Sequence, residues 1–258
     1  MLRSIYLAVF ALSVGAMMIA CSNSHTAKVD IGTQGGNPGG GGGNPTTSGK
    51  DWGVSHGFPA IWWETVDPKL KADWEILPQE AKPGEVILSK RNNLGKLLSN
   101  FGATPFTLRG KTYASIEGFW QATKYPEGPG DVRLDPKVVW KFTRSQVEQM
   151  TSFEAKDAGK LASDNMAALQ IDWVSFEGTK MIYREQGESE FYHLIRSTMI
   201  SKLLQNPDVY EILKKTKTLK LRPDHEVKAT EGKAWHFYSI WMELRDQILA
   251  GVALENIQ

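Results

Sequence analysis

An acidic, an amide and a basic side chain share one face of a short segment of this chain. Residues 115–124 read SIEGFWQATK, and Ser115 is placed to cap a helix with its hydroxyl group. Glu117, Gln121 and Lys124 then occupy positions i, i+4 and i+7, so that all three project from the same side. This arrangement is typical of the wall of a pocket.

The two ionisable groups on this face suit two kinds of chemistry. The Glu117 carboxylate can stabilise positive charge that develops on a substrate. The Lys124 amine, if burial makes its neutral form accessible, can attack an aldehyde and form a Schiff base. An ordinary helix salt bridge between them is not expected, because a separation of seven residues places the two Cα atoms roughly 10 Å apart.

Several helices and a few short strands must position this face. Residues 85–88 predict a strand, and residues 106–113 predict a hairpin that turns at Arg109-Gly110. Residues 218–222 alternate in polarity, as a half-exposed strand does. Helical patterns cover residues 115–125, 136–149, 153–161, 189–205, 207–215 and 234–250. We therefore expect an α+β fold, a helix-rich single domain with a few short strands.

The composition indicates one globular domain after an unusual amino-terminal region. From residue 51 to residue 258 the chain is long enough to bury a core without disulfides or metal, and no internal repeat is visible. Phe191, Ile195, Met199 and Leu203 recur every four residues and predict a buried helix face. The net charge of +1 disfavours a large binding surface for duplex nucleic acid. The basic residues at 214–222 are more typical of a solvated face than of a phosphate site.

Motifs along residues 86–249 are similar to those of one known family. They read LSNF at 98–101, PF at 105–106, YASIEGFWQATK at 113–124, EAKDAGK at 154–160, DW at 172–173, KLLQNP at 202–207 and MELR at 242–245. This series resembles the NADAR (YbiA-like) family. Two features depart from the family pattern: the chain is longer at residues 185–190, and no WG.G motif follows Asp224.

The resemblance implies an activity and a set of site residues. Members of that family are N-glycosidases that cut the bond between ribose and an amine or base, in riboflavin-pathway intermediates or in ADP-ribose attached to guanine. Glu117, Lys124 and Asp224 match the catalytic positions, Asp224 only weakly because the motif after it is missing. The substrate-binding residues implied are Ser99, Asn100, Phe101, Gln121 and Trp173, the last as a surface on which a flat base can stack. We expect no metal and no cofactor, because His193, His225 and His236 lack metal-ligand spacing.

The amino terminus predicts a lipid anchor. Arg3 precedes an apolar run that ends at Ala20, about as long as a signal-peptide core of roughly 7–15 residues. The MIAC sequence at 18–21 resembles the lipobox of bacterial lipoproteins, so residues 1–20 are expected to be a signal peptide and Cys21 the lipidated residue. An uncleaved anchor helix or a secreted chain are the alternatives. Ser22 resembles the residue found in lipoproteins sent to an outer membrane, which places the chain in the cell envelope, facing the periplasm or the exterior.

A flexible tether and an aromatic extension are expected between the anchor and the NADAR-like residues 84–258. Residues 21–50 are rich in glycine and cannot bury enough apolar area to offset the entropy lost on ordering. Residues 51–83 contain four tryptophans and lie outside the clear resemblance, and they are expected either to cap the site or to bind a partner.

The expected function is hydrolysis of a ribosyl C–N bond in an ADP-ribosyl or ribosylamine conjugate, with the membrane as partner through Cys21. The alternatives are a noncatalytic nucleotide or ADP-ribose-binding module and an envelope interaction protein. An envelope location does not suit the family's substrates, which are cytoplasmic, so the natural substrate stays open.

Overall fold

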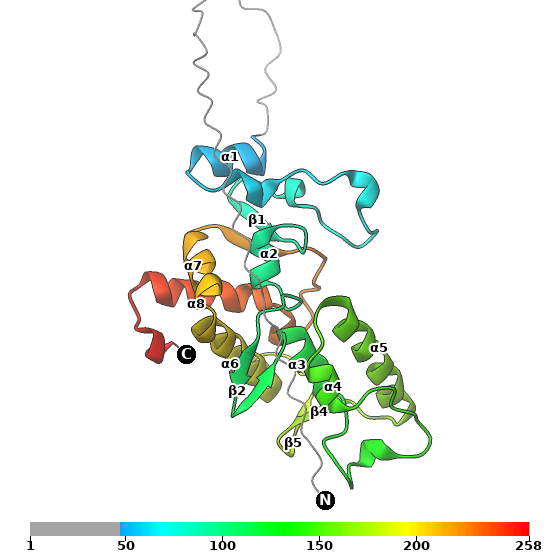
Figure 1. Ribbon diagram of the computed structural model, residues 1–258. Coiled ribbons are helices and arrows are strands. Elements are labelled where there is room, and N and C mark those ends of the chain that lie inside the picture. Colours follow the sequence, from blue (N-terminus) through cyan, green and yellow to red (C-terminus); the bar gives the residue numbers. More distant parts are fainter. Residues whose placement is uncertain (1–46, 258) are drawn as a thin grey trace, which may run out of the picture. The chain divides into compact units, whose positions relative to one another are not determined.

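The computed structural model describes residues 47–257, and the predicted signal peptide, Cys21 and nearly all of the predicted tether lie outside them. The described residues form a helix-rich α+β fold with short strands, as the sequence predicted (Figure 1). The helices are α1 (Gly49–Ser55), α2 (Asn93–Leu98), α3 (Ile116–Ala122), α4 (Arg144–Glu148), α5 (Ser152–Ala168), α6 (Glu190–Gln205), α7 (Pro207–Lys215) and α8 (Phe237–Leu249). None of the helices within these residues is both long and apolar enough to cross a bilayer.

The strands pair two by two. Strand β1 (Glu85–Leu88) pairs in parallel with β6 (Lys220–Pro223), with Leu88 opposite Pro223. Strands β2 (Phe106–Leu108) and β3 (Lys111–Tyr113) form the predicted hairpin, in which Arg109 and Gly110 both have positive φ. Strands β4 (Trp173–Phe176) and β5 (Thr179–Ile182) form a second hairpin that the sequence analysis did not predict.

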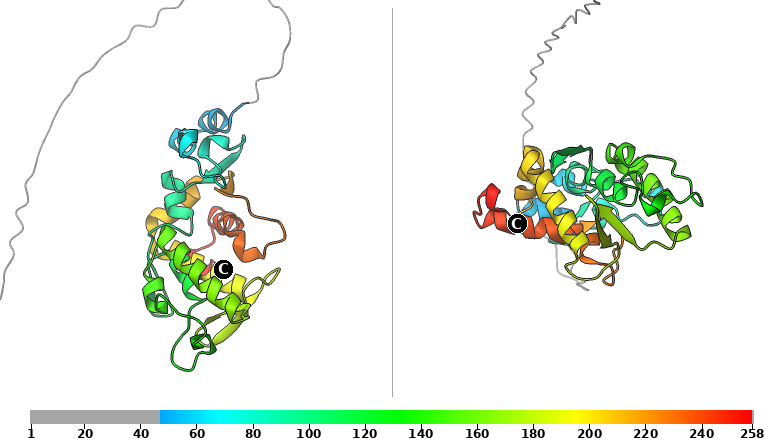
Figure 2. Two further views of the ribbon diagram at one scale, coloured as in Figure 1. Left: turned by 90° about the vertical axis from the view of Figure 1, so that its right-hand side faces the viewer. Right: turned by 90° about the horizontal axis from the view of Figure 1, so that it is seen from below.

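The helices divide into two groups around α3. Helix α3 packs against α4 and α5, while α6, α7 and α8 pack against one another, and Figures 1 and 2 show the two groups on opposite sides of the fold. The α6 residues Phe191, Ile195, Met199 and Leu203 are all buried, as their four-residue spacing predicted. Figure 2 also shows the long connection that leads from β6 to α8.

Several boundaries differ from the sequence expectations, among them the following three. The helix predicted over 136–149 forms only from Arg144, because Thr143 caps it there and Trp140 is bound to the Arg133 carbonyl through its indole N–H, at 2.7 Å. Helix α5 continues seven residues beyond the predicted end at 161, to Ala168. Helix α1 begins at Gly49, inside the expected tether, because Ser48 accepts the Asp51 N–H and a Cβ on Gly49 would come within 2.2 Å of the Ala81 carbonyl oxygen.

Candidate active site

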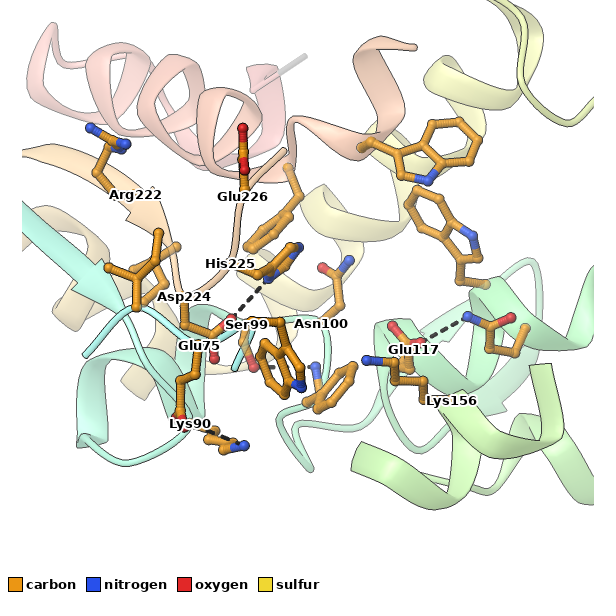
Figure 3. Close-up of a pocket in the computed structure, with 18 of the residues that line it drawn as sticks. Glu75, Lys90, Ser99, Asn100, Glu117, Lys156, Arg222, Asp224, His225 and Glu226 are labelled. Carbon is orange, nitrogen blue, oxygen red and sulfur yellow. Dashed lines mark hydrogen bonds and ion pairs between the residues drawn. The ribbon is translucent and has the colours of Figure 1, made fainter. Parts of the chain in front are cut away.

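A cavity of about 950 Å³ opens between three parts of the fold. One wall is α3 with residues 99–101, a second is residues 71–76 of the extension, and a third is Arg222 of β6 with residues 224–226 after it (Figure 3). Of the predicted site residues, the structure brings Glu117, Gln121, Ser99, Asn100, Phe101 and Asp224 to this cavity.

Helix α3 places the carboxyl group of Glu117 in the wall. The Ser115 hydroxyl accepts the Gly118 N–H at 2.9 Å, which starts the helix where the sequence predicted. Glu117 is 7% exposed, and its Oε1 accepts a hydrogen bond from the side-chain amide of Gln121 at 2.8 Å. Burial raises the pKa of Glu117, while the Gln121 hydrogen bond and then the charges of Lys124 and Lys156 act in the opposite direction. A carboxyl group of this kind is suited to hold and deliver a proton.

Two amide oxygens at the cavity lack partners among the described residues. Asn100 Oδ1 and Gln121 Oε1 are buried and accept no hydrogen bond there. The Asn100 loop is joined to the start of α3, because the Glu117 N–H donates to the Asn100 carbonyl oxygen at 2.9 Å. Unpartnered buried acceptors cost free energy, so a ligand that presents hydroxyl or amino hydrogens would compensate for them.

The structure does not bring the amine of Lys124 to the cavity. Helix α3 ends at Ala122, and the Lys124 ammonium donates to the Gly159 carbonyl at 3.2 Å and to the Ser163 hydroxyl at 2.9 Å. It also lies over the ring of Tyr183, 4.9 Å from the centroid, and Tyr183 is one of the residues that line the cavity. Burial lowers the pKa of Lys124 to about 8. The charge of Lys124 favours ionisation of Glu117.

The carboxyl ends of β1 and β6 supply the opposite wall. Because the two strands are parallel and Leu88 pairs with Pro223, the residues that follow them meet at one edge, Lys90 from the first strand and Asp224 and His225 from the second. Asp224 Oδ1 lies 2.9 Å from His225 Nδ1, which orients the imidazole ring. Figure 3 shows Asn100 between this pair and Glu117.

Part of the amino-terminal extension, residues 71–76, lines the cavity. The sequence had left the role of residues 51–83 open. The Ile76 N–H donates to the Asp224 carbonyl oxygen at 2.7 Å, and this bond attaches residues 71–76 to the end of β6. Trp74 and Glu75 line the cavity. The Glu75 carboxylate is 1% exposed and binds the Arg91 guanidinium at 2.6 and 2.7 Å, which lowers the pKa of Glu75.

Other residues of the cavity also escaped the sequence analysis. Among them are Lys90, Lys156, Tyr183, Glu226 and Trp235. Lys156 lies in the EAKDAGK motif at 154–160, which resembles the NADAR pattern, and this motif could have indicated it as a site residue. Nothing in the spacing along the chain points to the others.

Trp173 lies elsewhere. It lines a separate cavity of about 300 Å³, together with Arg133 and Lys180. The Arg133 guanidinium lies 4.8 Å from the Trp173 ring centroid, and the Lys180 ammonium lies 4.2 Å from it. The structure therefore does not bring Trp173 to the bases or sugars that the larger cavity could hold.

Within residues 47–257 no group of three or more His, Cys, Asp or Glu side chains is arranged to hold a metal ion. No protein-family model and no curated protein matches the chain. One solved structure is similar to it. This is the NMR structure of the E. coli protein YbiA, at 21% sequence identity and a TM-score of 0.39, with 63% of this chain and 83% of that chain covered. The chemistry proposed below rests on the side chains that line the cavity.

Proposed function

We propose that this protein hydrolyses the C–N bond between a ribosyl group and an amine or base. The observation that carries the proposal is the buried Glu117 carboxyl group, with its raised pKa, beside the unpartnered amide oxygens of Asn100 and Gln121. The resemblance of residues 98–124 to the NADAR family supports the same activity. An ADP-ribosyl or ribosylamine conjugate is the proposed substrate class.

The proposed reaction assigns different roles to Glu117 and Asp224, which lie on opposite walls of the cavity. Breaking the C–N bond leaves positive charge on the anomeric carbon, and the departing nitrogen needs a proton. Glu117, whose neutral form is favoured by burial, donates that proton. Asp224, on the opposite wall, stabilises the positive charge, and a water oxygen bonds to the anomeric carbon while its proton returns to Glu117. Asn100 holds a hydroxyl group of the sugar through its amide oxygen, and Gln121 positions Glu117 through its amide N–H.

Release of base or amine tests this proposal. The purified full-length protein, kept in mild detergent, is incubated with ADP-ribosylated guanosine or with a ribosylaminopyrimidine, and products are separated by chromatography. We expect release by the wild type and its loss in Glu117→Gln. A folded wild type that releases nothing from either substrate would argue against the hydrolase.

A noncatalytic ligand-binding module is the second candidate. It is favoured by the position of Lys124, whose amine does not reach the cavity, and by the missing WG.G motif after Asp224. Binding of ADP-ribose without release of base from any conjugate, measured by calorimetry on the same preparation, would favour the module over the hydrolase.

We also propose that Cys21 carries lipid and that the protein resides in the cell envelope. The support is the MIAC sequence at 18–21 after an apolar run. Metabolic labelling with a palmitate analogue should mark the wild type and leave Cys21→Ala unmarked. A wild type that carries no label would argue against the lipid anchor and against the envelope location.

A further inference from the structure

Two lysines share one tryptophan at the rim of the cavity. The Lys90 ammonium lies 4.8 Å from the centroid of the Trp74 ring, and the Lys156 ammonium lies 5.0 Å from it. All three residues line the cavity, and Trp74 is 43% exposed. Lys90 follows β1, Lys156 lies in α5 and Trp74 lies in the extension, so three separate segments meet here.

These two cations are less well neutralised than the others nearby. The Glu75 carboxylate binds Arg91 at 2.6 Å, while Lys90 lies 3.8 Å from the same carboxylate. Lys71 is held by Glu80, and Arg222 is held by Glu85. Among the interactions found in residues 47–257, Lys156 lies near aromatic rings, including Phe101 at 5.9 Å, and its charge acts on the buried Glu117.

The acidic residues of the cavity do not cancel this charge. Asp224 pairs with His225, and burial favours the neutral form of Glu117. In the part of the chain that the structure describes, Asp73, Glu117 and Glu226 form no ion pair with either lysine. Two like charges held beside one ring repel each other, and an anion placed with them would remove that repulsion. A phosphoryl group, with its several oxygen acceptors, suits two ammonium donors.

We propose that Trp74, Lys90 and Lys156 form a binding site for a phosphoryl group of the ligand. Trp74 holds the two ammonium groups in place through its ring, and they bind the anion. Lys156 and Glu117 line the same cavity, so one ligand could contact both of them. This inference rests on the ligand-binding role proposed for the cavity and not on hydrolysis.

Calorimetry with ribose 5-phosphate, ribose and inorganic phosphate tests the site. Each probe is titrated into the full-length wild type and into the double variant Lys90→Gln/Lys156→Gln. The matched control is Lys160→Gln, one helical turn from Lys156 on α5, where the lysine is exposed and paired with Asp164 at 2.9 Å. A thermal unfolding curve verifies that each variant is folded.

We expect ribose 5-phosphate to bind the wild type at least about tenfold more tightly than ribose, because two charge-assisted hydrogen bonds are added. The double variant should lose that preference, and Lys160→Gln should keep it. If inorganic phosphate binds as tightly as ribose 5-phosphate, the site exists and its ligand is free phosphate. A wild type without the preference, or a folded double variant that retains it, would overturn the proposal. None of these probes contains a ribosyl C–N bond. A wild type that binds ribose 5-phosphate but releases no base or amine would therefore count against the proposed hydrolysis and not against the phosphoryl site.

Discussion

Gly159 on α5 lies directly against the side-chain amide of Gln121 on α3. A Cβ atom added to Gly159 would come within 1.8 Å of Gln121 Oε1 and 2.1 Å of its amide carbon. The same amide donates to Glu117, and the Gly159 carbonyl accepts from Lys124. One glycine therefore lets the two helices approach closely enough to hold the proposed catalytic carboxyl group.

Replacing this glycine should disturb the site and the fold together. Gly159→Ala would force the Gln121 amide away from Glu117 and lower the free energy of unfolding by about 1–3 kcal/mol, as overpacking does. Urea denaturation measures the loss. Gly128→Ala is the control, because a Cβ there meets nothing within 4 Å. Equal stability of the two variants would show that α5 moves aside without cost.

Glu117→Gln should abolish turnover and yet stabilise the protein at neutral pH. The pKa of Glu117 is raised in the folded state, so ionisation of this carboxyl group costs stability as the pH rises through the raised pKa. The amide has no such cost. The variant should therefore gain roughly 0.5–2 kcal/mol relative to wild type near pH 7 and little near pH 4.

Urea unfolding of both proteins across this pH range tests the sign of the effect. A variant that is less stable than wild type at neutral pH would mean that the Glu117 carboxylate is held by charge more strongly than it is penalised by burial. Asp164→Asn, at an exposed position of α5, serves as the control for removing a carboxylate.

Lys124 should not form a covalent intermediate. Its amine is bound to Gly159 and Ser163 and does not line the cavity, so cyanoborohydride added with the ribosyl substrate should trap no adduct on this residue. Peptide mass spectrometry detects the adduct. A reduced imine on Lys124 would restore the Schiff-base route that the sequence left open.

Lys202 should make stability depend on pH. This fully buried amine donates to the Ser99 carbonyl at 3.0 Å, and burial lowers its pKa from 10.5 to about 7. The pKa of Lys202 is lower in the folded protein than in the unfolded chain, so folding is favoured most when this amine is neutral. Its contribution to the free energy of unfolding is fully present above pH 10.5 and is lost as the pH falls through about 7.

Lys202→Met should remove that part of the pH dependence, because methionine does not titrate. Unfolding free energies at several pH values measure the change in slope, and Lys160→Met, at an exposed site, should leave the slope unchanged. The same slope in Lys202→Met as in wild type would assign the dependence to other groups.

Local elements were predictable because their signals lie within a few residues. The Ser115 cap, the Arg109-Gly110 turn and the four-residue spacing of Phe191 to Leu203 each predicted the element that the structure contains. The β4–β5 hairpin had a similar signal at Glu177-Gly178, where both residues have positive φ, but its short strands were not recognised. Helix α4 was predicted too long because the apolar spacing of residues 136–143 is matched by loop contacts, such as that of Trp140, instead of helical packing.

The sequence by itself determined the fold class, the face of α3 that carries Glu117 and Gln121, and the motifs at 98–101. The tertiary structure alone decided that Lys90 and Asp224 lie at one edge, that Trp74 reaches the same cavity, and that Trp173 and the Lys124 amine do not. The physical reason is the range of the interactions involved. Capping and helical periodicity act between residues a few positions apart, whereas the parallel pairing of β1 with β6 and the bond from Ile76 to Asp224 join segments whose approach no local pattern records.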